Sequence, residues 1–551
     1  MIRYGLTSHT RISEGMKSCA PNGRLRAAIA NVSWHERSRF FGRPNGCEVV
    51  MCGFVCLWKI DDAVLAQSMI DKIAHRGPDE LRVSRAQNVP AVMAHCRLSI
   101  IGPEDGTQPI FSADNVLVAN GEIYNHADLR AILGESAFDT ESDSETILHL
   151  FRSDELRWVN KLDGMFAFVL ATPERVIAAR DPLGIKPLYM ARIGEGLAFA
   201  SELKAFDGLG LTQDDVEAID PGALFDSIDG FREWFRMPQG AAALGSDEDP
   251  EPIWRELRLV LESAVRKWMV ADVEVGAFLS GGLDSSIIAA LAAGALDRPL
   301  KTFAVGTAGS PDLAAARRVA DHIGSNHHEL VFTSDDLAEI VPHVIYHLES
   351  ADVDLVRSAL PTHFATTLAR RHVKAVLTGE GADELFAGYT YHHAYARKPR
   401  ALADEITRSL GAMHNINLQR VDRITMAQGL EARTPFLDRD LIDFAQSIPA
   451  SLKMKITDDP NHETMEKWIL RKACEDLLPD DIVWRKKAQF DEGSGTVDTL
   501  ARALSSVWGV KAPIDREAEG RLYERLLRER YEEPELILEK AGMWVANRVT
   551  V

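Results

Sequence analysis

One short segment divides the 551-residue chain into two parts with different sequence patterns. Residues 237–252, "MPQGAAALGSDEDPEP", are rich in Gly, Pro and acidic residues, a composition typical of a linker. Before them, short apolar segments such as "GFVCLWK" and "VLVANGEIYN" are separated by turn residues, which indicates two packed β-sheets with few helices. After them, apolar strands alternate with helices, which predicts a parallel α/β sheet.

The charge and cysteine content exclude several classes of protein. The formal net charge of -20 argues against a general nucleic-acid or membrane-surface binder, and no apolar run is long enough to span a bilayer. The six cysteines form neither a disulfide framework nor a CxxC zinc pattern. With 46% hydrophobic and 26% charged residues, the chain is predicted to be an ordinary globular protein in a reducing, cytoplasmic setting.

The first fifty residues differ from the rest. They carry eight Lys and Arg against three Asp and Glu, although the whole chain is acidic. They show no helical or strand period and no apolar core of a secretory signal. Their arginines and serines allow a transit peptide, and the alternative is sequence that is not part of the working protein.

A glycine-rich turn, "SGGLDSS" (Ser280–Ser286), lies between the apolar strand "VEVGAFLS" and a helix. Glycines let the backbone approach an anion, and the free N–H groups and dipole of a helix N-terminus favour phosphate. The GK[ST] ending of a Walker A loop is missing. Serine hydroxyls could donate to phosphate oxygens, whereas Asp284 would repel them unless Mg²⁺ lay between. The turn therefore suits the pyrophosphate portion of ATP.

Further segments in the second part follow in a recognisable order: "FAVGTAGSPDL", "VIYHLESADVDLVRS", "LTGEGADELFAGY", "GLEARTPFLD" and "RKKAQFDEGSG". With the glycine-rich turn they cover most of residues 255–500 and resemble the PP-loop ATP pyrophosphatases, and within them the asparagine synthetases. The ATP and pyrophosphate site implied by this resemblance comprises Leu279, Ser280, Gly281, Gly282, Asp284, Ser285, Ser286, Val305, Thr378 and Gly379. It also implies Glu380 and Lys487 as catalytic residues, Arg357 and Asp383 near the acceptor, and Asp284 and Asp383 as ligands of Mg²⁺.

The first part contains a cysteine, Cys52, directly after Met51 in "VVMCGF". It is followed by "HRGPDE", "RLSII", "NGEIYNH", "ESDSE" and "RDPLGIKPLY", in that order. This series resembles the class II glutamine amidotransferases, whose fold belongs to the N-terminal nucleophile hydrolases, over nearly all of residues 52–205. The resemblance implies Cys52, Asn120 and Gly121 as catalytic residues. It implies a glutamine site formed by Arg97, Leu98, Ile101, Asn120, Gly121, Glu122 and Asp143.

A cysteine that acts as a nucleophile needs a base to take the proton of its thiol. A thiol must lose its proton to attack the glutamine amide, and a chain-terminal α-amine, which titrates near neutrality, can take it. While Cys52 is internal, its nitrogen is a peptide amide and cannot act as a base. The hypothesis is therefore that residues 1–51 are absent from the active enzyme, through translation from Met51 with removal of Met or through proteolysis of a propeptide.

Together the two parts predict one architecture. We expect an extension of residues 1–51, an αββα sandwich of the N-terminal nucleophile hydrolase type in residues 52–236, a linker of residues 237–252, and a PP-loop α/β domain with a helical C-terminal portion in residues 253–551. The resemblance implies a glutamine-dependent asparagine synthetase. Ammonia from glutamine would displace AMP from aspartate that has been adenylated with ATP and Mg²⁺. Family members carry the ammonia through a tunnel, and some are homodimers.

Four positions depart from the family pattern. Asp354 and Leu355 stand where bacterial and plant asparagine synthetases usually have two threonines, Asn417 replaces an aspartate, and Thr378 replaces a serine. An acid at position 354 would repel a dicarboxylate, so amidation of another small carboxylate in a specialised pathway is an alternative. A β-lactam-synthetase-like cyclase would not need Cys52, and a non-catalytic regulatory or binding protein would not be expected to keep both sites complete.

Overall fold

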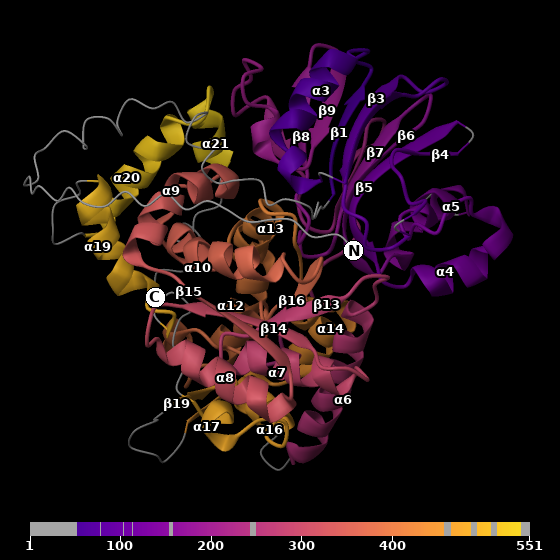
Figure 1. Cartoon of the computed structure of the whole chain (residues 1–551). Helices are drawn as coiled ribbons and strands as arrows, with labels where there is room; N and C mark the ends of the chain where they lie inside the picture. The colour runs from indigo at the N-terminus through magenta and orange to yellow at the C-terminus, as the bar shows by residue number, and fades with distance from the viewer. Residues whose placement is uncertain are drawn as a thin grey trace, which may run out of the picture. The chain divides into compact units, whose positions relative to one another are not determined.

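The computed structural model describes residues 52–77, 79–102, 104–112, 114–153, 158–242, 249–456, 464–485, 493–508 and 515–540. Its first part contains two antiparallel six-stranded sheets (Figure 1). The first sheet has the order β10 (Val216–Ala218), β8 (Tyr189–Ile193), β9 (Gly196–Ala200), β1 (Gly53–Trp58), β3 (Ala91–Arg97) and β2 (Glu80–Arg85). The second has the order β12 (Gly230–Glu233), β11 (Ala223–Asp226), β7 (Val176–Arg180), β6 (Gly164–Ala171), β5 (Asn115–Ile123) and β4 (Ile110–Ser112).

The two sheets pack face to face and carry helices on their outer faces. In β1, Phe54, Cys56 and Trp58 lie in the core shared by the sheets, whereas Val55 and Leu57 pack against helix α3 (Ala63–Lys72). Helices α4 (His126–Leu133) and α5 (Glu145–Ser153) cover the second sheet. Because β1 is buried on both faces, its sequence is a continuous apolar run without the alternation of a half-exposed strand. The predicted αββα sandwich is confirmed.

The second part is built on a five-stranded parallel sheet, also as predicted. Its strand order is β15 (Asn326–Val331), β14 (Lys301–Gly306), β13 (Val275–Phe278), β16 (Ala375–Leu377) and β17 (Glu431–Arg433). The chain winds outward from β13 through β14 and β15, and then returns to β16 on the other side of β13. In open α/β sheets, ligands bind at the carboxyl ends of the strands where the strand order reverses, which here is between β13 and β16.

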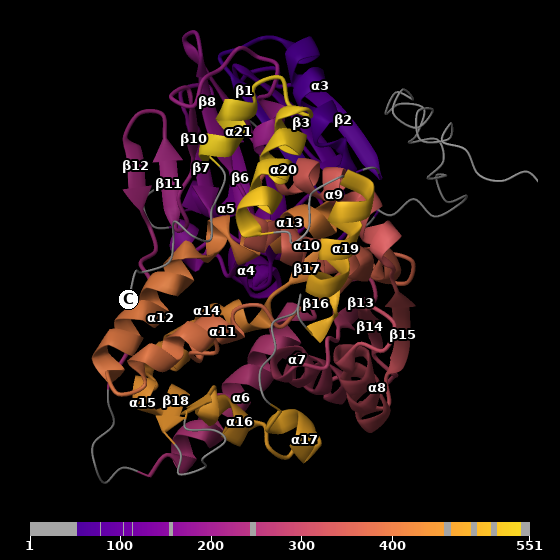
Figure 2. The ribbon, with the colours of Figure 1, turned by 90° about the vertical axis from the view of Figure 1, so that its left-hand side faces the viewer.

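Helices cover both faces of this sheet. On one face lie α6 (Glu251–Trp268), α7 (Leu283–Gly294) and α8 (Pro311–Ile323), and on the other α9 (Ser334–Leu348) and α10 (Val353–Ala369). Figure 2 shows α19 (Thr496–Trp508) and α20 (Arg516–Arg528) beside α9 and α10. The other elements are α11 (Ala382–Leu385), α12 (Pro399–Ala412), α13 (Asn417–Met426), α14 (Arg439–Ser447), α15 (Ala450–Lys453), α16 (Trp468–Ala473), α17 (Asp480–Val483), α21 (Pro534–Lys540) and the hairpin of β18 (Met454–Ile456) and β19 (Thr464–Glu466).

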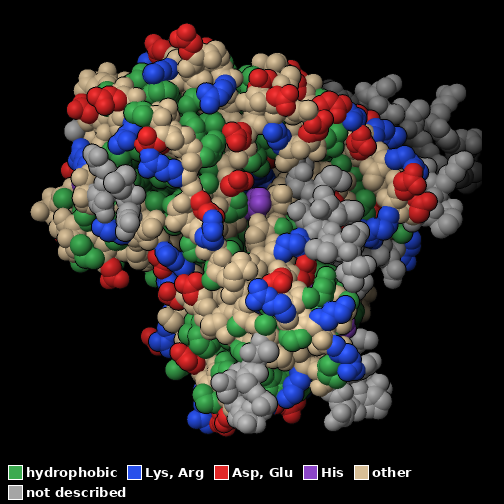
Figure 3. Space-filling view, turned by 180° about the vertical axis from the view of Figure 1, so that it is seen from behind, with side chains coloured by type: hydrophobic (Ala, Val, Ile, Leu, Met, Phe, Trp, Pro, Cys, Tyr) green, Lys and Arg blue, Asp and Glu red, His purple; other side chains and the backbone are tan. Residues whose placement is uncertain are grey.

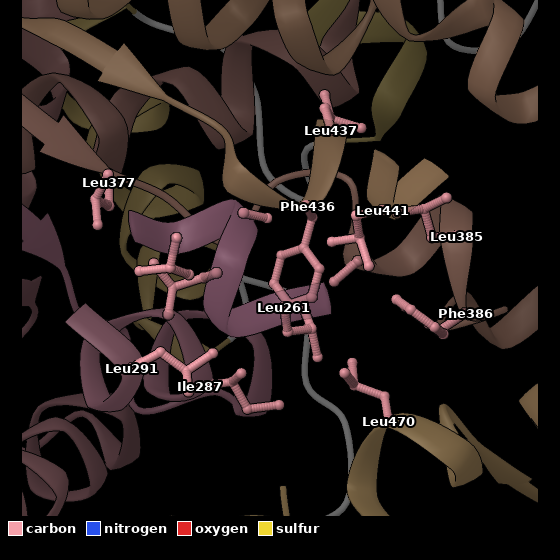
Figure 4. Packing of buried hydrophobic residues seen from close by; sticks show 14 of the residues in the cluster. Leu261, Ile287, Leu291, Leu377, Leu385, Phe386, Phe436, Leu437, Leu441 and Leu470 are labelled. Atoms are coloured by element: carbon pink, nitrogen blue, oxygen red, sulfur yellow. The ribbon is translucent and has the colours of Figure 1, made fainter. Parts of the chain in front are cut away.

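The largest hydrophobic cluster connects residues that are far apart in the sequence. Figure 4 shows Ile287 and Leu291 of α7, Leu261 of α6, Leu377 of β16 and Phe436 gathered in one core. The same cluster includes buried residues of the sandwich, such as Leu98 and Tyr124, so apolar packing runs across the junction of the two parts. The sandwich and the parallel-sheet part are therefore held together by buried apolar side chains, as well as by the ion pairs described below.

Two observations describe the helices and one face of the surface. None of the helices described by the structure is long and apolar enough to cross a membrane. On the face drawn in Figure 3, acidic and basic side chains are interspersed and do not gather by sign.

Candidate active sites

Cys52 lies immediately before β1, where it contacts the end of the neighbouring strand. The backbone N–H of Leu98 donates to the Cys52 Sγ at 3.3 Å, and the thiol lies 3.5 Å from the Leu98 carbonyl oxygen. Burial raises the pKa of this thiol to about 12, an effect that the contact with Leu98 only partly offsets. At neutral pH the thiol is protonated and unreactive unless a base acts on it directly. Nucleophilic chemistry here therefore requires a proton acceptor, such as a terminal amine.

Asn120 and Gly121 lie side by side in β5, and both have the properties of an oxyanion site. The Asn120 side chain is 1% exposed, and its amide nitrogen has no hydrogen-bond partner among the described residues. An unsatisfied buried donor is costly, which fits a group that donates to a bound molecule. Gly121 has φ of 130°, and a Cβ there would lie 1.9 Å from the Met165 carbonyl oxygen, so only glycine fits.

The residues predicted to hold the ends of glutamine are also buried. Arg97, at the end of β3, donates from Nη2 to the Gly102 carbonyl at 2.5 Å. Glu122 and Asp143 are 6% and 5% exposed, and burial raises the pKa of both carboxyls. Glu122 Oε2 has no hydrogen-bond partner among the described residues, although the Arg433 guanidinium lies 3.6 Å away. Two buried acids suit a bound ammonium group, which would favour their ionised forms.

The second site is a cavity of about 540 Å³ where the parallel strand order reverses. Its described walls include nine residues that the sequence analysis assigned to ATP or catalysis: Leu279, Ser280, Gly282, Asp284, Ser285, Val305, Thr378, Gly379 and Glu380. Asp383, assigned to the acceptor and to Mg²⁺, also lines the cavity. Gly281 and Ser286 lie in the same turn but do not line the cavity. Gly281 packs on α8, where a Cβ would come 2.5 Å from the Ala316 nitrogen, and Ser286 is fully buried.

The turn before α7 has the features of an anion site. Helix α7 begins after Gly282 without a side-chain cap, so its first N–H groups face the cavity unpaired by a capping side chain. Ser280 and Ser285 contact each other through their hydroxyls at 3.0 Å. The loop after β16, which contains Gly379, lies close to this turn, since a Cβ at Gly379 would lie 2.8 Å from the Ser285 nitrogen. These contacts bring the two predicted segments together around one cavity.

The structure adds a lysine that the sequence analysis missed. Lys467 Nζ lies 2.5 Å from the nearer oxygen of Asp284 and 2.5 Å from Asp383, and the side chain is almost fully buried. Burial opposes its charge, but the two carboxylates raise its pKa above the ordinary value. In the sequence it is one lysine among many, in "MEKW". Gly388 makes room for it, since a Cβ there would lie 2.2 Å from Lys467 Cε. Lys487, the lysine predicted instead, lies outside the described residues and stays a prediction.

Two further carboxyl groups face the cavity, one in an ion pair and one hydrogen-bonded to neutral side chains. Glu380 accepts from Arg420 Nη2 at 2.6 Å. Burial raises the pKa of Glu384 to about 7, and this carboxyl accepts from the Tyr389 hydroxyl at 2.6 Å and from the Asn417 amide at 2.9 Å. An aspartate at position 417 could not make this donation. Asn417, which departs from the family pattern, is therefore matched to Glu384 by a hydrogen bond.

The predicted acceptor region lies where α20 meets α10. Asp354 and Leu355 line the cavity, and Asp354 pairs with Arg516 of α20. Arg357, in contrast, does not line the cavity and pairs with Glu519 of α20 at 2.6 Å. The acidic side chain that was expected to disfavour a dicarboxylate is thus part of the wall. Arg516 of α20, which is half exposed, is its ion-pair partner.

A divalent cation fits the donor chemistry of the cavity only with help from a ligand. No group of three or more His, Cys, Asp or Glu side chains placed to hold a metal exists among the described residues. Asp284 and Asp383 provide two carboxylates near the anion-binding turn, joined through Lys467. Mg²⁺ is commonly bound by one or two carboxylates together with the phosphates of a nucleotide, so these two residues fit such a role.

The fold defines a chain of two parts, each with a candidate site: an amidotransferase-type sandwich that carries Cys52, joined to an α/β part with a parallel sheet and a cavity at its strand reversal. Comparison with known proteins agrees. The family model "Asparagine synthase" matches residues 256–410 and 396–547, and "Glutamine amidotransferase domain" matches residues 51–226.

Named relatives extend this match over most of the chain. "Asparagine synthetase [glutamine-hydrolyzing]" of Triphysaria versicolor is 39% identical over 474 residues, which is 81% of this chain and 78% of the relative. "Probable asparagine synthetase [glutamine-hydrolyzing]" of Schizosaccharomyces pombe is 38% identical over 522 residues, covering 85% of this chain and 92% of the relative. The chain belongs to the asparagine synthase family.

Proposed function

We propose that the protein is a glutamine-dependent asparagine synthetase, an ATP-dependent ligase that takes its nitrogen from glutamine. One observation carries the proposal: a single chain contains both a half-buried thiol, in a sandwich that also holds an unsatisfied buried amide donor, and a nucleotide-sized cavity at the reversal of a parallel sheet. The names of its relatives support aspartate as the acceptor.

At the first site, the α-amine of Cys52 would take the thiol proton, and the thiolate would attack the side-chain amide of glutamine. The Asn120 amide and the Gly121 N–H would stabilise the oxyanion that develops. Arg97 would pair with the carboxylate of glutamine, while Glu122 and Asp143 would hold its ammonium group, and Leu98 and Ile101 would line the site. Collapse of the adduct would break the C–N bond and expel ammonia, which takes the proton held by the α-amine, and would leave a γ-glutamyl thioester on Cys52. Water would then hydrolyse this thioester to glutamate and the free thiol, and the ammonia would pass to the second site.

At the second site, the turn from Ser280 to Ser285 and the N-terminus of α7 would hold the pyrophosphate portion of ATP. Glu380 and Lys467 face the same space, so Lys467 would offset the negative charge that accumulates as the acceptor carboxylate attacks the α-phosphate. The cavity's described walls hold six acidic and four basic side chains, which disfavours a free nucleotide polyanion. Mg²⁺ at Asp284 and Asp383, when bound, would screen the phosphate charge.

The requirement for a free amine at Cys52 leads to a proposal about the chain. In the active enzyme, residues 1–51 would be absent, with residues 52–236 forming the glutaminase domain and residues 253–551 the synthetase domain after a linker of residues 237–252. The four free cysteines among the described residues, Cys52, Cys56, Cys96 and Cys474, support a reducing cytoplasmic location. Formation of a homodimer stays a prediction.

Asp354 keeps a second candidate function open. A carboxylate in the cavity wall disfavours a dicarboxylate acceptor by like-charge repulsion, unless Arg516 neutralises it. An acceptor with one carboxylate and a neutral or cationic second group would fit this wall better. The alternative is therefore a ligase of the same reaction class that amidates another small carboxylate.

A product assay separates the two candidates. Protein that begins at Met51 is incubated with glutamine, ATP, Mg²⁺ and one of a panel of small carboxylates, and amide, AMP and pyrophosphate are measured. Asparagine and AMP from aspartate support the proposal. Turnover of another carboxylate, but not of aspartate, would favour the alternative, and glutamate release without AMP formation from any acceptor would refute both.

A further inference from the structure

A buried group of charges lies at the junction of the sandwich and the parallel-sheet part. Its members are Arg76, Lys186, Glu202 and Lys204 from the first part and Glu349, Asp422, Arg423, Glu431 and Arg433 from the second, none more than 6% exposed. Buried ion pairs rarely stabilise a fold more than apolar side chains of similar volume would. A role in setting the orientation of the two parts therefore explains a group of this size at their junction better than a contribution to stability does.

Arg76 connects this group to the nucleophile. Its guanidinium is fully buried, and Nε donates to the backbone carbonyl of Cys52 at 3.2 Å. The other two nitrogens form a fork on Asp422, with contacts of 2.8 Å to Oδ2 and 3.1 Å to Oδ1. Nη1 also contacts Glu202 at 2.5 Å. A bidentate contact of this kind fixes the plane of the guanidinium, and hence the direction of the Nε–H bond.

Asp422 belongs to α13, a helix of the synthetase part that lies between the two sites. Asn417 and Arg420, three residues apart on one face, contact Glu384 and Glu380 of the nucleotide cavity. Asp422, two positions beyond Arg420, points to the opposite side and reaches Arg76. Arg423 and Lys186 lie 3.3 Å and 3.9 Å from its carboxylate. Although burial disfavours the charge, Arg76 and Lys186 hold the pKa of Asp422 below its ordinary value.

We propose that Asp422 is a positioning residue of the glutaminase, which acts through Arg76 to hold the carbonyl of Cys52 in place from the synthetase side of the junction. This inference rests on the proposed function, in which Cys52 is the first residue. A terminal residue has no preceding peptide to fix it, so its carbonyl and its side chain are its remaining anchors. Misplacement of a reacting atom by about 1 Å can cost about a hundred-fold in rate.

The role predicts a specific kinetic pattern for Asp422→Ala. The kcat for glutamine hydrolysis should fall about 10- to 100-fold while KM for glutamine changes less than about three-fold, because the glutamine-binding residues are untouched. Synthesis with ammonia in place of glutamine should stay within about three-fold, because the opposite face of α13 is unchanged. Asp422→Asn, which keeps one acceptor for Arg76, should lie between the alanine variant and the unsubstituted enzyme.

The matched control is Asp163→Asn. Asp163 also forms an ion pair across the junction, at 2.7 Å to Lys267, but neither residue contacts Cys52 or lines the cavity. Both activities of this variant should stay within about two-fold. Arg76→Ala should lower glutamine kcat as Asp422→Ala does, and the double variant should be no worse than the poorer single one, because both changes break the same contact.

The outcomes are separable. If the unsubstituted enzyme does not hydrolyse glutamine, the proposed function fails, and this inference fails with it. If it does, and Asp422→Ala retains the glutamine kcat of Asp163→Asn, the positioning role is wrong. Equal loss of glutamine-dependent and ammonia-dependent synthesis in both Asp422→Ala and Asp422→Asn would also overturn it, since that pattern indicates a general structural role. If Asp422→Ala does not fold, the kinetics of Asp422→Asn decide between the same outcomes.

Discussion

The glutamine site and the nucleotide cavity are built in opposite ways. In the first, buried groups such as the Asn120 amide and Glu122 Oε2 have no hydrogen-bond partner among the described residues, so the site is ready for a ligand. In the second, the charged groups occupy one another: Lys467 contacts Asp284 and Asp383, and Arg420 contacts Glu380. A ligand would therefore meet an unpaired donor at Asn120 in the first site, whereas in the second it must exchange contacts that the charged groups already make. The two sites should respond differently to substitution.

The largest separation between the sites is expected from Cys52→Ala. Glutamine-dependent synthesis should fall at least about a thousand-fold, because no other group supplies the nucleophile. Synthesis with ammonia should stay within about three-fold, as measured by asparagine and AMP formation. Cys56→Ala, a change in the neighbouring core, is the control. Equal loss of both activities in Cys52→Ala, with Cys56→Ala unaffected, would contradict the two-site mechanism.

Asn120→Ala tests the unsatisfied donor. Glutaminase kcat should fall about 10²- to 10³-fold, the usual cost of removing one oxyanion donor. The thermal midpoint should change little, because the amide nitrogen has no partner to lose among the described residues. Asn88→Ala, on the surface, is the control. A large drop in stability with unchanged kcat would mean that Asn120 is a packing residue.

Lys467→Met tests the paired cavity. Synthesis should fall about a hundred-fold with either nitrogen source, because Asp284 and Asp383 lose the charge that offsets them and the bound phosphates. Glutaminase activity should stay within about three-fold. Lys472→Met, in helix α16, which begins directly after Lys467, is partly exposed and should leave both activities unchanged. Retention of ammonia-dependent synthesis in Lys467→Met would remove Lys467 from the proposed mechanism.

These expectations depend on residues of which some, but not all, could be predicted from the sequence. The residues expected at the glutamine site stay a prediction, and they come from two short segments: Asn120, Gly121 and Glu122 are consecutive in β5, and Arg97, Leu98 and Ile101 lie close together in the sequence. The parallel sheet could be predicted from the strand–turn–helix pattern around residues 275–294. Residues that are close together in the sequence are also close in space, so a site built from them can be predicted from the sequence.

The ion pairs of the nucleotide cavity are harder to predict from the sequence, because they join segments that are far apart in it. Lys467 meets Asp284, which precedes it by 183 residues, and no periodicity points to that contact. The pairing of Arg357 with Glu519, and the place of Arg420 on Glu380, depend on how α20 and α13 pack. Such residues are found only when the fold brings them together.

A smaller effect is expected at the acceptor wall. Asp354→Asn should lower KM for aspartate about three- to ten-fold, because it removes a like charge from the cavity wall. Steady-state synthesis over a range of aspartate concentrations measures it, with the exposed Asp335→Asn as the control. A higher KM in Asp354→Asn would indicate that this carboxylate binds the acceptor's cationic group, and would sharpen the choice of acceptor.

The last prediction concerns stability and not activity. The pKa of Glu384 is raised from 4.5 to about 7 in the folded protein, so the folded state retains a proton that the unfolded state has lost. Its contribution is full below about pH 4.5 and is lost as the pH rises through about 7, on the order of 3 kcal/mol. Glu384→Gln should therefore gain stability relative to the unsubstituted protein between pH 5 and 8, by about that amount. Thermal midpoints across this range, compared with exposed Glu256→Gln, measure it. A constant difference would contradict the shift.

The central claim is that Cys52 must be the first residue of a working glutaminase, since its thiol is protonated at neutral pH unless its own amine takes the proton. The most direct test is the intact mass and N-terminal peptide of active enzyme purified from its native host. We predict a chain that begins at Cys52 with a free α-amine. Enzyme that hydrolyses glutamine while residues before Cys52 are still attached would contradict this claim.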